Sequence, residues 1–392
     1  MNFNNEYDQP FQVGLPVSSN NFKGRTEILN DILTPLSHIS KNHQEHFFIT
    51  GPRGIGKTSL SRFIADYVEL EYNILTIHIE NNGVETVEEL LNKIITSLLK
   101  KAKKESTTLK LKKYIEENVT TIGLWSTEIK INENSSILTD VKNHFPYTIQ
   151  ELFYEIKNKN GLLIIIDDIN GLSDNELFPN WYKSMVDTIA VDNEIDMPIS
   201  FILTGYSGKF GKLHRLNPSI SRIFQRKQLE KLNDTDVEIF FNDIFNKMNI
   251  TIEKEALDLM VKYTNGLPLI MQQIGLSIYN KLNISNTISK EIAIRGIESA
   301  GDSIWINQIS SNYEGYEESK YYLSIFNKVL LFNEYKFTKD NLENIITSKE
   351  KEILDKFLDI SINLNILRKK ENTFIIKNDI VKSYINMRNL ED

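Results

Sequence analysis

The sequence has 392 residues, no cysteine, and a net charge of −8 at pH 7 from 45 Lys and Arg and 53 Asp and Glu. Its 41% hydrophobic and 25% charged residues are ordinary for a globular protein of two or three domains. The lack of cysteine excludes disulfides and Cys-based zinc or iron–sulfur sites, and the negative charge argues against a general nucleic-acid coat. No apolar run reaches the roughly 18 residues of a membrane span, so we expect a cytoplasmic protein with no membrane partner.

The first segment with structural character follows a polar start. Residues 1–20 show little periodicity, and we expect them to form an extended arm. Phe22-Lys23-Gly24-Arg25 then precedes an amphipathic helix. Alone, this pattern indicates only the entry to a helix, but it gains weight because a stronger motif follows that helix.

The strongest motif begins with a short apolar strand, His46–Thr50. The next eight residues read G-x-x-x-x-G-K-T, and an amphipathic helix follows them. This strand–loop–helix context is that of a phosphate-binding P-loop, in which backbone N–H groups surround a phosphate. Lys57 is expected to reach the β- and γ-phosphates and Thr58 to bind Mg²⁺. The candidate nucleotide-binding residues here are Gly51, Pro52, Arg53, Gly54, Ile55, Gly56, Lys57, Thr58 and Leu60.

The region after the P-loop helix is less informative. Alternation over residues 74–79 predicts a second strand, and residues 84–118 predict a helix. Seven lysines between Lys100 and Lys113 form a basic cluster, which is either a solvated helix face or a patch for nucleic acid or a partner. Residues 120–136 form either a hairpin or a flap.

Two carboxylates follow the next apolar run. Residues 161–166 predict a strand buried on both faces, and Asp167 and Asp168 end it. Ligands bind at this edge of open α/β sheets. We therefore expect Asp167 to hold Mg²⁺ and Asp168 to orient or deprotonate the attacking water. The simpler alternative is that both acids only cap the strand.

A third apolar run ends at Thr204-Gly205. The Thr204 hydroxyl would contact the γ-phosphate or the attacking water, unless Thr204 only forms a turn. A basic stretch with Arg222 follows, and then a strand near Leu229. Asn233 is an expected N-cap, and Gly266-Leu267-Pro268 joins two helices of a bundle over residues 233–300.

The last segment, residues 316–392, predicts three helices and then a hairpin, the order of a winged helix. It holds 13 Lys and Arg and 13 Asp and Glu, whereas a module that binds duplex DNA is usually basic. Its basic spot is Arg368-Lys369-Lys370. This favours a protein-contact or regulatory module, with DNA binding as the alternative.

Together these motifs resemble the archaeal-type ATPases of the STAND class and their AAA+ relatives, the origin-recognition/Cdc6-like initiators, over about residues 20–390. The resemblance implies an α/β fold of the ASCE P-loop NTPase type, with a parallel sheet in the order 5-1-4-3-2, a helical lid and a C-terminal winged helix. The domains would be an arm (1–20), an ATPase core (21–232), a lid (233–315) and a winged helix (316–392).

The resemblance also implies site residues outside the P-loop. Phe22, Gly24 and Arg25, together with Pro268, would lie near the adenine. Arg222 would meet the γ-phosphate, either of its own chain or of a neighbouring subunit, unless it is an ordinary surface arginine paired with an acid. The expected catalytic residues are therefore Lys57, Asp168, Thr204 and Arg222.

Two departures from the AAA+ pattern bear on activity. Asp168 stands where a longer glutamate is usual, and Gly-Leu-Pro stands where many lids carry a sensor arginine. Both favour an ATP- and Mg²⁺-dependent switch that hydrolyses slowly and acts on a protein partner or within a homo-oligomer. The alternatives are a DNA-binding initiator or transposition-type regulator, with weak DNA binding, and an ATPase subunit of a bacterial antiviral defence system that controls a separate effector.

Overall fold

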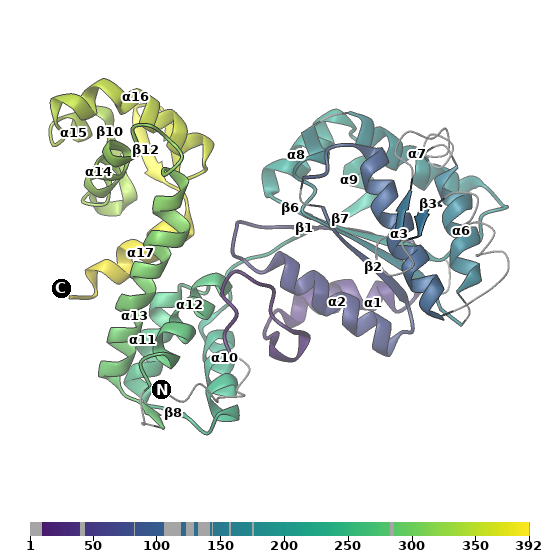
Figure 1. The fold of residues 1–392 in the computed structure, drawn as a ribbon, viewed down its shortest axis with the longest axis horizontal. Coiled ribbons are helices and arrows are strands. Elements are labelled where there is room, and N and C mark those ends of the chain that lie inside the picture. Colours follow the sequence, from purple (N-terminus) through teal and green to yellow (C-terminus); the bar gives the residue numbers. More distant parts are fainter. Residues whose placement is uncertain are drawn as a thin grey trace. The chain divides into compact units, whose positions relative to one another are not determined.

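The computed structural model describes residues 10–39, 44–81, 83–105, 119–122, 129–131, 142, 144–156, 158–174, 176–282 and 286–391. The chain divides into two compact units (Figure 1). One is Pro16–Glu230, and the other combines Met1–Leu15 with Lys231–Asp392. Within the described residues, no helix is both long and apolar enough to cross a membrane.

The unit Pro16–Glu230 is built on a five-stranded sheet in the order β2-β5-β6-β1-β7. All neighbouring strands are parallel. When these five strands are numbered 1 to 5 in chain order and read from the β7 edge, the order is 5-1-4-3-2, so the expected parallel sheet is confirmed. The strands are β1 (His46–Thr50), β2 (Leu75–Glu80), β5 (Leu162–Asp167), β6 (Ile199–Gly205) and β7 (Phe224–Gln228).

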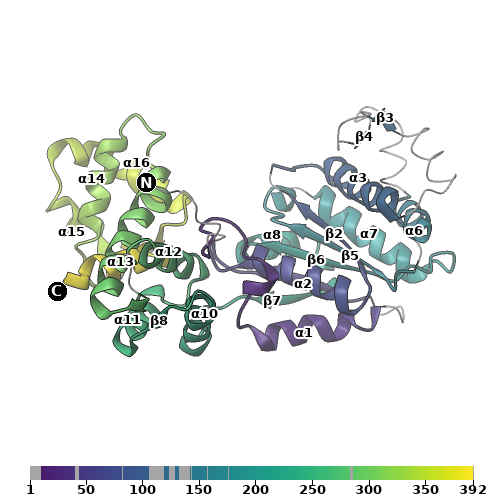
Figure 2. The same cartoon turned by 60° about the horizontal axis from the view of Figure 1, so that its bottom comes forward.

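Helices cover both faces of this sheet, which explains why its central strands read as uninterrupted apolar runs. Figure 2 shows α3 and α7 on one face and α1 and α2 on the other. Every residue of β1, β5 and β6 is buried. The helices are α1 (Thr26–Leu36), α2 (Lys57–Glu71), α3 (Val87–Glu105), α6 (Phe145–Glu155), α7 (Leu177–Val191), α8 (Ser207–Leu216) and α9 (Ile220–Ile223).

Three details of this unit differ from the sequence reading. The last strand is Phe224–Gln228 rather than a strand at Leu229, because an edge strand that buries little beyond Phe224 carries a weak apolar signal. The helices α6, α7, α8 and α9 were not predicted. The α3 helix is described only as far as Glu105, so the rest of the expected helix lies outside the described residues.

The basic cluster and the segment after it are described only in part. Lys101 pairs with Glu69 of α2, and the lysines beyond residue 105 lie outside the described residues. Of residues 120–136, the described parts form an antiparallel pair, β3 (Val119–Ile122) with β4 (Ile129–Ile131). This agrees with the hairpin alternative.

The second unit begins with packed helices. The Asn233 side chain accepts a hydrogen bond from the Asp236 backbone N–H at 2.8 Å, as expected of an N-cap. Gly266 has φ 66°, and a Cβ there would lie 2.2 Å from the Leu232 carbonyl oxygen, so this turn requires glycine. The elements are α10 (Asp234–Lys247), β8 (Thr251–Ile252), α11 (Lys254–Thr264), α12 (Pro268–Tyr279), β9 (Thr287–Ile288) and α13 (Lys290–Ile304).

Part of the expected arm packs into this second unit. Phe11 is 1% exposed, and its ring lies 5.3 Å from that of Phe245 and 6.2 Å from that of Phe240. The Gln12 backbone N–H donates to the Gln272 side chain at 2.9 Å. Residues 10–15 are therefore anchored by an aromatic side chain, whereas residues 1–9 lie outside the described residues.

The C-terminal part of the second unit contains the predicted helices and hairpin. Its strands form an antiparallel sheet in the order β10-β12-β11. One more helix, α17, was not predicted and packs against α13 and α11. The winged-helix assignment itself stays a prediction. The elements are α14 (Ser319–Val329), β10 (Lys336–Thr338), α15 (Lys339–Glu343), α16 (Ser348–Asn363), β11 (Leu367–Lys370), β12 (Thr373–Ile376) and α17 (Asp379–Arg388).

Short helical turns join these elements. They are η1 (Ser19–Asn21), η3 (Leu172–Asp174), η4 (Trp305–Ile309), η5 (Ser310–Asn312), η6 (Asn333–Tyr335) and η7 (Asn389–Glu391).

A buried ion pair joins α14 to α16. Glu350 is 2% exposed and accepts hydrogen bonds from the Lys328 ammonium and from the Thr347 backbone N–H. Burial by itself raises the pKa of Glu350, but the hydrogen bonds from Lys328, Ser324 and Thr347 outweigh it and lower this pKa to about 2. The ionised carboxylate therefore stabilises the folded state.

Replacing Glu350 with glutamine is expected to lower the free energy of unfolding at pH 7 by about 2 kcal/mol, because Lys328 would lose its buried counter-charge. The folded pKa lies below the unfolded value, so the carboxylate's contribution is present above about pH 4.3 and is lost as the pH falls towards 2. The difference between wild type and Glu350→Gln, measured by urea unfolding, should shrink over that range. Glu352→Gln, an exposed acid on the same helix, is the control. Equal stability of wild type and Glu350→Gln at pH 7 would contradict this account.

Candidate nucleotide-binding site

The predicted P-loop lies at the carboxyl end of β1. Gly54 and Gly56 have φ 76° and 91°, a left-handed conformation that side chains disfavour, so these two glycines let the chain curl back before α2 begins at Lys57. A Cβ at Gly51 would lie 2.8 Å from a methyl carbon of Ile55. The unpaired N–H groups and positive dipole end of α2, a 15-residue helix, therefore face the loop, as an anion site requires.

Lys57 is held inside the loop. Its ammonium donates to the carbonyl oxygens of Gly51 at 2.9 Å and Pro52 at 3.0 Å. Burial lowers the pKa of Lys57 to about 8, although the charges of Asp168 and Asp167 oppose the shift. A bound polyphosphate would supply the negative charge that restores its protonation.

The segment Phe22–Arg25 lies against the P-loop and α2. The Arg25 guanidinium donates to the Ile55 carbonyl at 2.7 Å and to the Glu230 carbonyl at 3.1 Å, so Arg25 supports the loop from its outer side. Phe22 stacks on Phe63 of α2 with ring centroids 4.8 Å apart, and Gly24 has φ 74°. Their place near an adenine stays a prediction, as does that of Pro268, which begins α12 in the other unit.

The two carboxylates lie at the same edge of the sheet as the P-loop. Strand β6 lies between β5, which ends at Asp167, and β1, which leads into the loop. Asp167 ends β5 and is 6% exposed. Thr204 of β6 pairs with Ile49 of β1, one residue before the strand ends. Its hydroxyl donates to Asp167 Oδ1 and accepts the Asp168 backbone N–H at 3.0 Å. The structure thus brings Asp167, Asp168 and Thr204 together beside the P-loop strand.

The Thr204 hydroxyl has two hydrogen-bond partners within the chain. A threonine hydroxyl has one proton to donate, and here that proton goes to Asp167. A phosphate oxygen would need the same proton. These contacts link Thr204 to both aspartates, and its role towards the γ-phosphate or the attacking water stays a prediction.

Asp168 has an unusual backbone conformation, with φ 64°. Its N–H is held by Thr204 and its carbonyl oxygen by the side-chain amide of Asn81, at 3.2 Å. Its own Oδ1 accepts a hydrogen bond from the Asn170 backbone N–H at 3.3 Å, so the carboxylate is turned towards the backbone two residues further along. The side chain of Thr204 in β6 and that of Asn81 directly after β2 thus fix the position of Asp168, and these two strands flank β5.

Asn81 was missed by the sequence reading. It follows β2 directly, is 2% exposed, and donates its backbone N–H to the Asp167 carbonyl at 2.9 Å. Among the described residues its side-chain Oδ1 has no hydrogen-bond partner. The signal that singled out Asp167, a polar residue at the carboxyl end of a buried parallel strand, also applies to Asn81.

Arg222 lies away from the P-loop of its own chain. It belongs to α9, directly before β7, and Phe224 pairs with His46 at the amino end of β1. The five residues of β1 separate the two edges of the sheet by roughly 13 Å. Arg222 is exposed and forms no salt bridge within the described parts of the chain. The arrangement therefore disfavours contact with the γ-phosphate of the same chain, and the role towards a neighbouring subunit stays a prediction.

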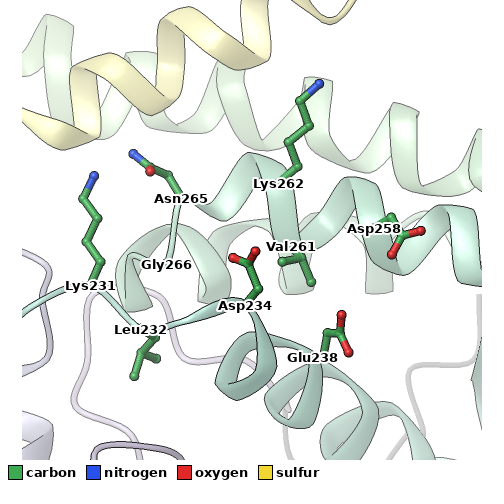
Figure 3. A pocket seen from close by; sticks show the side chains of 9 residues that line it. All are labelled: Lys231, Leu232, Asp234, Glu238, Asp258, Val261, Lys262, Asn265 and Gly266. Atoms are coloured by element: carbon green, nitrogen blue, oxygen red, sulfur yellow. The ribbon is translucent and has the colours of Figure 1, made fainter.

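A separate pocket of about 500 Å³ lies in the second unit, between the start of α10 and the end of α11 (Figure 3). Its charged lining side chains are Lys231, Asp234, Glu238, Asp258 and Lys262. Three carboxylates against two ammonium groups would repel a nucleotide triphosphate. This pocket is therefore unsuited to a nucleoside triphosphate.

A five-stranded parallel sheet of this order, with G-x-x-x-x-G-K-T after its first strand, is the AAA+ P-loop NTPase fold. Residues 21–180 match the family model of the AAA ATPase domain. Over this stretch, which is less than half of the sequence, the chain is therefore similar to AAA ATPase domains.

Curated relatives match over a short stretch. Over 92 residues the chain is 33% identical to the Holliday junction branch migration complex subunit RuvB of Mycoplasma pneumoniae and 32% identical to that of Mycoplasma genitalium. These alignments cover 23% of this chain and 28% of each relative, so the chain spans little more than a quarter of their length.

Solved structures match over nearly the whole chain at low identity. The Walker-type ATPase PABY2304 of Pyrococcus abyssi is 16% identical, with a TM-score of 0.58 over 96% of this chain and 99% of that one. The ORC2 protein of Aeropyrum pernix, in ADPNP–ADP complexes, is 11% identical, with a TM-score of 0.54 over 98% of both chains. At these identities the likeness shows the fold alone.

Proposed function

We propose that this protein binds ATP with Mg²⁺ at the P-loop, hydrolyses it slowly, and uses the nucleotide as a conformational switch. The observation that carries the proposal is the meeting of three parts at one edge of the sheet. These are the half-buried Lys57 in its loop, the Asp167–Asp168 pair, and the Thr204 hydroxyl that links the two aspartates.

The donor set near the P-loop suits Mg²⁺, which prefers hard oxygen ligands. Thr58 offers a hydroxyl at the start of α2, and Asp167 a buried carboxylate. Only one Asp167 oxygen, Oδ1, is hydrogen-bonded to a described side chain, which leaves the other for the ion or its water. When bound, Mg²⁺ would neutralise charge on the β- and γ-phosphates.

Slow hydrolysis follows from the position of Asp168. Its carboxylate is one methylene shorter than the glutamate usual in AAA+ enzymes, and it accepts a hydrogen bond from the Asn170 backbone. Both features reduce its reach towards an attacking water. A general base that does not reach the water would not supply the usual acceleration of hydrolysis, a factor of about 10²–10⁴.

A switch also needs ATP and ADP to favour different conformations. The γ-phosphate distinguishes them, and Lys57 is placed to meet it. ATP binding and ATP hydrolysis should therefore be measurable as two distinct steps. Wild-type protein should bind ATP in a one-to-one ratio while single-turnover hydrolysis stays slow, and hydrogen exchange should differ between the ATP and ADP states. Fast turnover, or identical exchange in both states, would count against a switch.

Arg222 gives a test of assembly. If it completes a neighbouring subunit's site, Arg222→Ala should lower the hydrolysis rate, because its charge would no longer stabilise the transferred phosphate; well-studied arginine fingers are worth about 10³–10⁵. Mixing Arg222→Ala with Asp168→Asn protein should then restore activity, since some interfaces would hold both native groups. Lys227→Ala, on the exposed edge strand nearby, is the control. Normal hydrolysis by Arg222→Ala would remove Arg222 from the mechanism.

A second candidate function involves DNA. Arg368, Lys369 and Lys370 are consecutive and exposed on β11, and the curated relatives named above belong to a Holliday junction complex. Few phosphate contacts are available around these residues, so any duplex binding should be weak and lost as salt rises. A complex that persists at high salt in an anisotropy assay would favour the initiator alternative over a switch that acts on protein.

A further inference from the structure

Tyr206 lies inside the candidate site, yet none of the roles above uses it. It follows β6 directly, two residues after Thr204, and stands at the N-cap of α8. Its ring centroid is 4.9 Å from the Lys57 ammonium nitrogen. Although the residue is 40% exposed, its aromatic face covers a charge that is itself largely buried.

The surroundings of Lys57 show what this ring contributes. An ammonium group has three donors, and two of them bind the carbonyl oxygens of Gly51 and Pro52. The Tyr206 ring adds a cation–π contact. Within the described residues no further hydrogen bond of this ammonium is present, so one donor remains for a phosphate oxygen. A long lysine side chain with four rotatable bonds is thereby fixed at three points.

The charges of the same site act on the hydroxyl group of Tyr206. Burial raises the pKa of Tyr206, and the charge of Asp168 raises it further, while Arg53 lowers it. The phenol therefore stays neutral at physiological pH and cannot act as a base there. The part of Tyr206 that distinguishes the site is the ring over Lys57.

We propose that Tyr206 is a positioning residue for Lys57: its ring screens the ammonium from water and holds it between the P-loop carbonyls, ready for the terminal phosphate of a nucleoside triphosphate. The inference rests on the proposed ATP site and adds a determinant of selectivity. Because the γ-phosphate would depend on Lys57 more than the inner phosphates do, the ring increases the preference for ATP over ADP.

The test measures ATP and ADP affinity by fluorescent-nucleotide titration in Tyr206→Ala, Tyr206→Phe and wild-type protein. Because Tyr206→Ala loses the cation–π contact, it should bind ATP roughly tenfold more weakly, with less than a twofold change for ADP. Tyr206→Phe keeps the ring and should match wild type. If Tyr206→Phe loses affinity as Tyr206→Ala does, the hydroxyl and not the ring matters, and the proposal is wrong.

Controls keep the outcomes distinct. Tyr154→Ala removes an exposed tyrosine of α6, remote from the site, and should leave both affinities unchanged. If Tyr206→Ala does not fold, Tyr206→Leu replaces it, since leucine fills similar space without an aromatic face. If wild type binds ATP, Lys57→Ala does not, and Tyr206→Ala equals wild type, then only this inference fails. If wild type binds no ATP, the proposed function itself fails.

Discussion

Lys57→Ala is expected to lower ATP affinity by roughly 10²–10³. We expect the ammonium to donate charge-assisted hydrogen bonds to the β- and γ-phosphates, and each such bond is worth about 1.5–3 kcal/mol. The loop glycines and the dipole of α2 would remain, so weak phosphate binding can persist. A titration with a fluorescent ATP analogue measures the loss directly.

The control for this variant is Lys183→Ala. Lys183 lies on α7, pairs with Asp187 and is half-exposed, so its removal changes the net charge equally without touching the site. Lys57→Ala also removes a desolvated charge, and its melting temperature should stay close to that of wild type. Unchanged ATP affinity in a folded Lys57→Ala protein would show that nucleotide does not bind at this loop.

The central strands were predictable because their signal is local. Strands β1, β5 and β6 are buried on both faces, so each reads as a continuous apolar run bounded by polar residues or glycine. The P-loop is equally local, since its glycines, lysine and threonine are contiguous in sequence. The resemblance then supplied the strand order, which the observed pairing confirms.

Other elements could not be predicted from the sequence, because the residues that they pack against lie far away in the chain. Edge strand β7 consists largely of exposed polar residues, so its place was put too late in the sequence. Phe11 packs against Phe240 and Phe245, more than 200 residues away, which no periodicity in the first 20 residues reveals. Helix α17 is short, and its packing against α13 and α11 is not visible in its own sequence.

The same distinction applies within the site. Asp167, Asp168 and Thr204 were named from the rule that ligands bind at the carboxyl ends of parallel strands. The rule does not predict which group accepts the hydrogen bond from the Thr204 hydroxyl. The contact of Thr204 with Asp167 is a pairing across strands, as is that of Asn81 with Asp168. It is these contacts that assign Thr204 and Asn81 to positioning the carboxylates.

Asp168→Asn is expected to bind ATP within about threefold of wild type and to reduce hydrolysis by about 10²–10⁴, the usual contribution of a general base. Asparagine suits the left-handed backbone at this position, where φ is 64°, so the Thr204 and Asn81 contacts to its backbone should survive. Its amide cannot accept the proton of the attacking water. Asp167→Asn should differ by weakening the dependence on Mg²⁺ as well.

Asp168→Glu completes the series and tests why turnover is slow. One added methylene extends the carboxylate beyond the hydrogen bond with the Asn170 backbone, so hydrolysis should rise above the wild-type rate while ATP affinity stays the same. Single-turnover measurements with excess protein separate the chemical step from product release. Native-rate hydrolysis by Asp168→Asn would exclude Asp168 as the base. If Asp168→Glu is no faster than wild type, reach does not limit the reaction, and the slow step lies in the conformational change that follows ATP binding.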